Sequence, residues 1–427
     1  MTLATTNNMF AQAADTSYQK PSWMLLLLSA SLSSVPLILF MLISTSVFAS
    51  TEQPAHKPWY KFNHPSSYYQ SEHALNIAQN IVALQRSSGG WGKLVDPSKI
   101  SNSIELSAQV AADKVLASIY DKPNETKYTH RGSTFDNNAT WAHLRFLIRV
   151  NQHRADKNLD VAIEQGYRYV FDAQAESGGW PQNYPNTASY GGYLTFNDNA
   201  IVGVMYSLME CKSGRYFEHN NELVSKCDTR FARGLEFIIQ TQVTLNGKKT
   251  GWAQQYTQEL QPAEGRVYEL PSISALATTN VIKLLMELEN PSERIKGAIV
   301  SATEWLKSIA LRDRKIETVQ GNKYQSRSSL RVKESSGGDF STLEFNSYGK
   351  DKLERLSQDS PRIWARFYDL AHSKPLFAGW DGQPKTSLNE IDHERRLNYR
   401  WYGSWPKTLL DKQWPKWRHK YLTEKSE

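Results

Sequence analysis

Two short polar motifs, TFDNNA at residues 134–139 and TFNDNA at 195–200, each place one aspartate just ahead of an apolar helical run. An aspartate before a helix commonly caps free backbone N–H groups, and a single copy would be interpreted in that way. Two copies favour a second interpretation, in which Asp136 and Asp198 face the same opening. Together with the neighbouring asparagines they supply the hard oxygen ligands that Ca²⁺ takes in an open site. The motifs are therefore compatible with a calcium site at Asp136 and Asp198, but an EF-hand loop is missing and they do not identify such a site by themselves.

Three arginines form the second set of candidate residues. Arg266 lies in GRVYELPSIS (265–274), Arg366 in WARFYDL (364–370) and Arg395 in EIDHERRLNYRWYG (390–403). A guanidinium group binds a carboxylate in a planar, bidentate manner, as recognition of an acidic sugar requires. Each arginine alone is typical of a surface ion pair. In combination with the oxygen-rich motifs, they indicate a cleft for a polyanionic sugar.

Composition agrees with an acidic partner. The 50 Lys and Arg residues exceed the 43 Asp and Glu residues by seven, which gives a modest basic excess. The basic residues are scattered, and zinc-finger spacing, aromatic RNA-binding signatures and basic heptad helices are missing, which argues against nucleic acid. The 13 Trp and 21 Tyr residues supply many flat rings for stacking on sugars. We therefore favour an acidic polysaccharide as the partner and expect no protein partner and a monomer.

Helices must position these residues. Apolar residues recur at three- and four-residue intervals over 73–85, 140–153, 160–174, 200–210, 231–242, 275–288 and 294–310. Three of these helices end in a glutamine, followed by a glycine turn and a tryptophan, as in LQRSSGGWGK (84–93), AQAESGGWPQ (173–182) and TQVTLNGKKTGWAQ (241–254). Such a repeat predicts a circular array of helical hairpins. The expected fold is all-α, and the tryptophans are interpreted as structural rather than as sugar platforms.

The N-terminus predicts export. Residues 1–49 contain a polar lead, an apolar run from Met24 to Phe48 and a small-x-Ala pattern before Ser50. This segment is a signal peptide or an N-terminal membrane anchor, so residues 50–427 are expected in the periplasm or outside the cell. Cys211 and Cys227 either close a loop disulfide or remain two free thiols. The sequence leaves both alternatives open.

The order of the motifs TFDNNAT, GGWPQNYP, LTFNDNA, RVYELPSIS, WARFYDL and IDHERR resembles the family 10 polysaccharide lyases over roughly residues 70–405. These are pectate lyases with an (α/α) toroid fold that cleave polygalacturonate by β-elimination with Ca²⁺. The resemblance implies that Asp136 and Asp198 hold calcium and that Asn137 assists at the substrate. It also implies that Arg266 is the base and that Arg366 binds a uronate carboxylate. Arg395 is assigned to substrate binding.

The chain departs from the family pattern at three places. Trp380 in LFAGWDG (376–382) stands where the family has an arginine, which predicts a stacking ring and tolerance of a neutral or esterified sugar. Gly192 and Tyr193 replace an acidic residue and a histidine, which affects the expected calcium shell. Residues 312–360 form a polar insertion, interpreted as a lid or a surface excursion.

Two other functions are compatible with the residues. One is a glycoside hydrolase on the same toroid, with Asp136 and Asp198 as general acid and base. The other is a non-catalytic binder of acidic polysaccharide, which the loss of the arginine at position 380 favours.

Overall fold

The computed structural model describes residues 58–123, 131–154, 156–215, 217, 220–321 and 349–423. The predicted export segment, residues 1–49, lies outside this range. The first half contains α1 (Ser66–Tyr69), α2 (Glu72–Ala83), α3 (Ser103–Tyr120), α4 (Trp141–Asn151), α5 (Lys157–Asp172) and α6 (Ala200–Lys212). The second half contains α7 (Asn221–Gln240), α8 (Ala275–Met286), α9 (Glu293–Ser308), α11 (His393–Asn398), α12 (Trp405–Thr408) and α13 (Trp414–Leu422). Every helix that the periodicity predicts is present, although α7 begins ten residues before the predicted start.

The helices pair as hairpins around an inner row. Helix α4 packs on α6, α6 on α8 and α8 on α12, while α5, α7 and α9 pack against α4, α6 and α8, respectively. The inner helices are apolar on most sides, and every residue from Ala200 to Met205 on α6 is buried. Outer helices such as α7 carry one apolar stripe that includes Leu223, Phe231 and Phe237. This arrangement is the predicted (α/α) toroid of helical hairpins.

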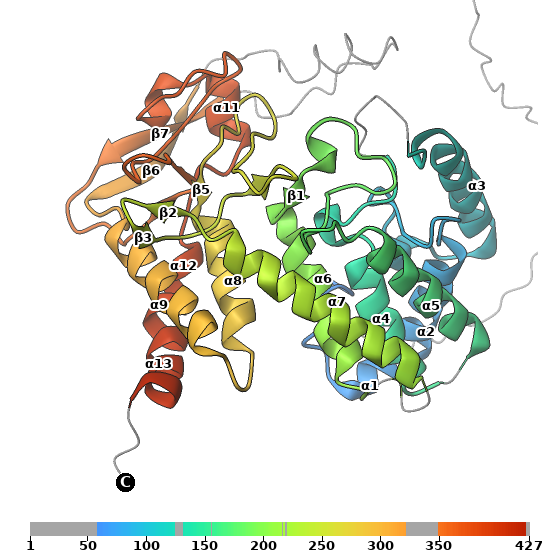
Figure 1. Cartoon of the computed structure of the whole chain (residues 1–427). Coiled ribbons are helices and arrows are strands. Elements are labelled where there is room, and N and C mark those ends of the chain that lie inside the picture. Colours follow the sequence, from blue (N-terminus) through green and yellow to red (C-terminus); the bar gives the residue numbers. More distant parts are fainter. Residues whose placement is uncertain are drawn as a thin grey trace, which may run out of the picture. The chain divides into compact units, whose positions relative to one another are not determined.

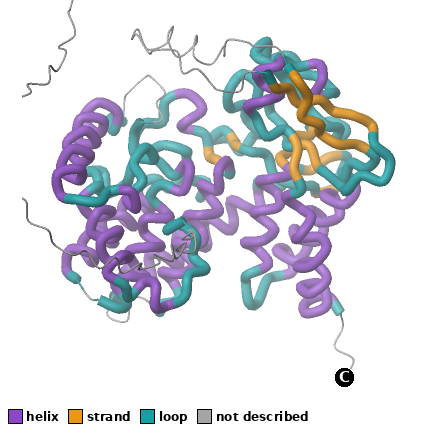
Figure 2. Tube along the Cα trace, turned by 180° about the vertical axis from the view of Figure 1, so that it is seen from behind, coloured by secondary structure: helices purple, strands orange, loops and turns teal. Residues whose placement is uncertain are grey.

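Loops and short strands connect each outer helix to the next inner helix, and they lie together above the helices in Figure 1. The antiparallel pairs are β1 (Leu194–Thr195) with β4 (Gln255–Tyr256), β5 (Ile273–Ser274) with β9 (Phe367–Tyr368), and β8 (Trp364–Ala365) with β10 (Tyr402–Gly403). A further pair is β2 (Thr244–Leu245) with β3 (Lys248–Lys249). Figure 2 shows the same division, with helices in one layer and the strands beside loops at one end of them. We call this loop layer the rim.

The repeated tryptophans join neighbouring hairpins, as predicted. Trp91, Trp180 and Trp252 are at most 1% exposed, and each indole Nε1 donates to a carbonyl of the preceding outer helix at 2.7–2.8 Å. The glutamine amides cross to the next outer helix: the Nε2 of Gln85 donates to the carbonyl of Ala162 at 2.8 Å. Gln174 and Gln242 make the equivalent bonds to α7 and α9. The tryptophan bonds satisfy carbonyls that the helix C-termini leave free, whereas the glutamine bonds reach carbonyls within the neighbouring helices and tie the hairpins together.

The two cysteines form a disulfide bond. Cys211 on α6 and Cys227 on α7 form a disulfide with Cα atoms 6.0 Å apart, which resolves the alternative left open by the sequence.

The flanks of the polar insertion form a β-ribbon of β6 (Arg314–Gln320) and β7 (Lys350–Leu356). Its middle, including SSGGDFS, lies outside the described residues. No helix in the described part of the chain is long and apolar enough to cross a membrane.

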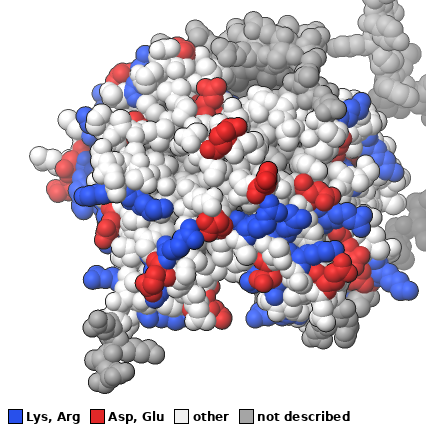
Figure 3. All heavy atoms as spheres, in the orientation of Figure 1, with Lys and Arg blue, Asp and Glu red and all other residues white. Residues whose placement is uncertain are grey.

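Charge is distributed rather than gathered on the face shown in Figure 3. Lys and Arg lie beside Asp and Glu over the lower part of that face, and the upper part is mostly uncharged. The described residues on this face therefore form no broad basic surface.

Candidate active site

A fourth tryptophan repeat, which sequence reasoning missed, completes the rim. The Nε1 of Trp364 donates to the carbonyl of Leu306 at 2.7 Å and the ring is fully buried, as in the other three copies. In all four copies the residue two positions after the tryptophan points to a common polar network, and these residues are Lys93, Gln182, Gln254 and Arg366. The signal was present as the spacing W-x-polar. It was obscured because the fourth copy lacks the preceding glycine.

The twin motifs form two matching turns rather than helix caps. Asp136–Asn138 and Asn197–Asn199 are 3₁₀ turns, and the helices that follow them receive no side-chain cap. The last two residues of each turn have positive φ angles: 50° and 67° in the first turn, and 46° and 63° in the second. Non-glycine residues rarely adopt this conformation, and asparagine and aspartate tolerate it best. The interpretation of the aspartates as N-caps is therefore wrong, and both carboxylates are available to the site.

The two turns pack on each other and bring Asp136 and Asp198 close enough for their charges to interact. Asp136 is buried: Oδ2 accepts from the Nζ of Lys93 and lies 3.4 Å from the Nε2 of Gln182. Its Oδ1 has no hydrogen-bond partner among the described residues. The surrounding protein atoms and the negative charge of Asp136 raise the pKa of Asp198, while Arg366 and Arg266 act in the opposite direction.

This donor set fits a cation. Two facing carboxylates with an unpaired buried oxygen are unfavourable unless a positive charge lies between them. Asparagine oxygens of the same turns are the additional hard donors that calcium uses, and water completes such open sites. A group of three or more His, Cys, Asp or Glu side chains is not found among the described residues, so carboxylates alone do not complete a shell.

Arg366 connects the turns to the next part of the rim. It is buried, and its Nη2 donates to the Oδ1 of Asn197 at 3.1 Å and to the Oε1 of Gln254 at 2.9 Å. Gln254 in turn donates through Nε2 to the Oε1 of Glu269 at 3.3 Å. The guanidinium also lies 4.9 Å from the ring centroid of Tyr399. Arg366 is therefore held in a fixed orientation on the rim.

Arg266 forms a bidentate pair with Glu269. Its Nε and Nη2 donate to the two carboxylate oxygens at 2.9 and 2.6 Å, and the hydroxyl of Tyr399 donates to the same carboxylate at 2.6 Å. Burial alone would raise the pKa of Glu269, but the hydrogen bonds and charge of Arg266 lower it to about 2. For Arg266, burial acts to lower the pKa, and Glu269 outweighs it and raises the pKa. Arg266 is therefore protonated in this state, while its side chain remains 43% exposed.

Trp380 and Arg395 form one aromatic and cationic cluster with Tyr268. The guanidinium of Arg395 lies 4.6 Å from the ring centroid of Tyr268 and 4.8 Å from that of Trp380. Trp380 Nε1 donates to the Oε2 of Glu394 at 2.7 Å, and Glu394 also receives the Nε of Arg395 at 2.6 Å. Arg266 lies 5.0 Å from the ring centroid of the same Tyr268. This cluster therefore adjoins Arg266.

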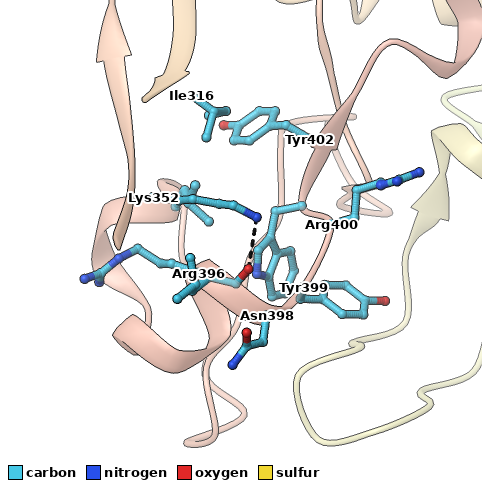
Figure 4. Close-up of a pocket in the computed structure, with 10 residues that line it drawn as sticks. Ile316, Lys352, Arg396, Asn398, Tyr399, Arg400 and Tyr402 are labelled. Carbon is cyan, nitrogen blue, oxygen red and sulfur yellow. Dashed lines mark hydrogen bonds between the residues drawn. The ribbon is translucent and has the colours of Figure 1, made fainter. Parts of the chain in front are cut away.

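Arg396 and Arg400, in the same motif as Arg395, have different surroundings. They line a cavity of about 330 Å³ between the β6–β7 ribbon and the segment that follows α11. In Figure 4 the two side chains extend to opposite sides of that segment. Arg396 Nη2 pairs with the Oδ2 of Asp351 on β7 at 2.5 Å. Of the three arginines, only Arg395 joins the aromatic cluster beside Arg266.

The structure thus brings Asp136, Asp198, Arg266 and Arg366 into one electrostatic unit, because both arginines act on the pKa of Asp198. Asn137 is exposed on the first turn, beside Asp136. Sequence reasoning missed Lys93, Gln254 and Tyr399, and it gave Glu269 no role. The only sequence signal for Lys93 and Gln254 was their place two positions after a repeated tryptophan.

Comparison with known proteins identifies the family. A family model described as pectic acid lyase matches residues 85–340 and 340–410. The chain belongs to the pectic acid lyase family. The predicted resemblance and the enzyme class, a polysaccharide lyase, are thereby confirmed. A search of curated proteins found no match.

Two solved structures show the same fold. A point mutant of the family 10 polysaccharide lyase from Cellvibrio cellulosa, in complex with trigalacturonic acid, has a TM-score of 0.60 and 21% identity, covering 84% of this chain and 98% of the other. The family 10 polysaccharide lyase from Cellvibrio cellulosa has the same TM-score and identity, covering 83% of this chain and 96% of the other. At this identity the likeness supports the (α/α) toroid and leaves individual side chains to be argued from the geometry.

Proposed function

We propose that this protein is a calcium-dependent pectate lyase that cleaves α-1,4-polygalacturonate by β-elimination. The observation that carries the proposal is the convergence of a carboxylate pair with Arg366 and Arg266 on one rim. The complex of a related lyase with trigalacturonic acid supports the substrate class.

Elimination transfers the proton on C5 of a uronate to a base, forms the C4–C5 double bond and expels the glycosidic oxygen from C4, which takes up a proton from water and leaves as a hydroxyl group. Negative charge builds on the uronate carboxylate during this step, and positive groups around that carboxylate lower the barrier. Arg366 is oriented to bind it, and Asn137 is exposed beside it. Asp136 and Asp198 would hold the calcium ion, which when bound would offset the same charge.

Arg266 is the proposed base. Two of its nitrogens are held by Glu269, and Nη1 has no hydrogen bond among the described residues. A base must accept a proton, and the raised pKa of Arg266 means that Nη1 must first lose one. The positive charges of Arg366 and Arg395 nearby favour that loss. The alternative role, a second carboxylate clamp, requires no deprotonation.

The geometry supports the lyase over the hydrolase. Glycoside hydrolases keep their two carboxyl groups about 5–9.5 Å apart to accommodate a nucleophile or a water molecule. Asp136 is already paired with Lys93 and its charge raises the pKa of Asp198, an arrangement that suits a shared cation better than a separate acid and base.

The proposal also includes export and action as a monomer. The segment 1–49 supports export. Residues 50–427 then form the catalytic domain in the periplasm or outside the cell.

The decisive experiment is ultraviolet absorbance during incubation with polygalacturonate, because elimination leaves a conjugated double bond and hydrolysis does not. We expect a calcium-dependent rise that a chelator abolishes. Arg266→Ala should lower turnover by about 10²-fold or more and leave retention on the polymer largely intact. Arg294→Ala, which removes an exposed arginine paired with Glu236, is the matched control. New reducing ends without absorbance would indicate a hydrolase, retention without cleavage would indicate a binder, and unchanged turnover in Arg266→Ala would exclude it as the base.

A further inference from the structure

A cavity of about 250 Å³ lies among the inner helices α4, α6 and α8. Its lining includes Asn138 and Asn199, the last residues of the twin turns, and extends along the helices to Tyr206 and Lys283. Asp136 and Asp198 do not line it, and neither do Asn137 or the rim arginines. The cavity therefore adjoins the carboxylate pair, and only the asparagines that end the turns border both places.

Lys283 gives the cavity a positive charge. It is half-buried, and no ion pair to it is found in the described part of the chain. Burial lowers its pKa. The nearby carboxylates have other partners, because Glu287 receives the hydroxyl of Tyr206 at 2.9 Å and Glu210 is held by Arg145 and Arg149. The exposed Lys61 adds a second charge to the lining.

Trp141 contributes an aromatic ring to the lining. The residue is 6% exposed, and its Nε1 has no acceptor among the described residues. The ring lies directly on Gly203, where an added Cβ atom would come within 2.2 Å of the indole. The N–H itself is covered by protein atoms, so Trp141 presents its aromatic ring to the cavity.

Amides and aromatic rings complete the lining. Asn280 donates through Nδ2 to the Oδ1 of Asn199 at 2.6 Å, which leaves the Nδ2 of Asn199 and the Oδ1 of Asn280 available to a ligand. Phe62 and Tyr206 both flank the guanidinium of Arg145, at 4.1 and 5.3 Å from their ring centroids. Apolar rings combined with a few convergent polar groups are typical of small-molecule sites.

We propose that this cavity binds a single uronate ring. Lys283 pairs with the carboxylate, the asparagine amides bind ring oxygens, and the aromatic rings, including that of Trp141, contact the apolar face of the sugar. Sites for drug-sized ligands measure about 300–1,000 Å³, so this smaller cavity suits one ring rather than an oligomer. The choice of galacturonate as the uronate rests on the proposed function, whereas the anion and sugar chemistry rests on the cavity itself.

Calorimetry with the full chain tests the proposal. We expect galacturonate to bind wild-type protein, and Lys283→Gln to weaken this binding by about tenfold or more, because a hydrogen bond to a charged group is lost. Lys226→Gln, which removes an exposed lysine of α7, is the matched control. Galactose, which lacks the carboxylate, and acetate, which lacks the ring, should each bind at least tenfold more weakly than galacturonate. The proposal would be overturned if galactose or acetate bound as tightly as galacturonate, or if Lys283→Gln bound galacturonate with unchanged affinity.

A second measurement separates the cavity from the catalytic rim. Galacturonate should shift one indole N–H resonance, assigned to Trp141 by its loss in Trp141→Phe, and the shift should persist in Arg366→Ala. Turnover of polygalacturonate by Lys283→Gln should remain within about twofold of wild type. A shift that disappears in Arg366→Ala would place the sugar on the rim and refute the cavity. These readouts do not depend on elimination, so a failed absorbance assay would leave them interpretable.

Discussion

At the scale of single residues, the site depends on which partner each charged group already has. Arg366 donates to neutral amide oxygens, whereas Arg266 and Arg395 each donate to a buried glutamate. An arginine bound only to amides retains its full charge toward a substrate carboxylate, while one paired with a glutamate is partly neutralised. On the proposed function, we therefore expect Arg366 to bind a uronate carboxylate more strongly than Arg266 or Arg395.

Substitution of Trp380 tests how the site distinguishes unesterified from methylated sugars. Trp380 stands at the position of an expected arginine and instead donates to Glu394, which also binds Arg395. Trp380→Arg should restore a positive charge, so we expect activity on unesterified polygalacturonate to rise relative to methylated pectin, by about threefold or more. The ratio of initial rates on the two polymers measures this. Trp380→Phe, which keeps a ring and adds no charge, is the control, and an unchanged ratio in Trp380→Arg would remove position 380 from substrate selection.

At the scale of elements, the glycine turns set how closely the hairpins pack. Gly178 has a φ of 96°, and an added Cβ would lie 2.3 Å from the carbonyl oxygen of Arg233 on α7. Gly178→Ala should therefore destabilise the fold by about 2 kcal/mol or more, through both strain and displacement of α7. Gly297→Ala on α9 is the matched control, because its Cβ meets nothing within 4 Å and alanine favours a helix. Thermal unfolding should show a lower midpoint for the first variant and an unchanged or higher one for the second.

Sequence predicted the elements wherever periodicity and burial coincide. Helices α4, α6 and α8 bury most of their side chains, so their apolar pattern is strong. Helix α3 was missed because its only buried residue is a charged one, Asp113, which pairs with Arg86 at 2.6 Å. Within the site, Asp136 and Asp198 were predicted because they repeat. Tyr399 was not, because its contact with Glu269 joins residues 130 apart in sequence, which no local pattern encodes. Lys93 was not, because the polar position that follows the repeated tryptophans was overlooked.

At the scale of the whole molecule, stability depends on a titratable group buried under the rim. His143 on α4 is stacked on Trp91 with ring centroids 5.2 Å apart, and it also contacts Trp59. Burial lowers the pKa of His143 to about 3, with a smaller opposing effect from Asp96. An unfolded histidine titrates near 6.5, so the stability that this residue contributes is complete above that pH and is lost as the pH falls toward 3.

The free energy of unfolding should therefore fall by about 2 kcal/mol between pH 7 and pH 5 on account of His143 alone, because only the unfolded state takes up the proton. His143→Gln, which does not titrate, should be less stable at pH 7 but should lack this part of the decline. His419→Gln on the surface of α13 provides the control, and denaturant unfolding at both pH values provides the measurement. Equal declines in wild type and His143→Gln would mean that the proton enters the folded protein. The stacked His143 ring would then be protonated in the folded protein. The packing around Trp91 would not limit the stability of the fold at low pH.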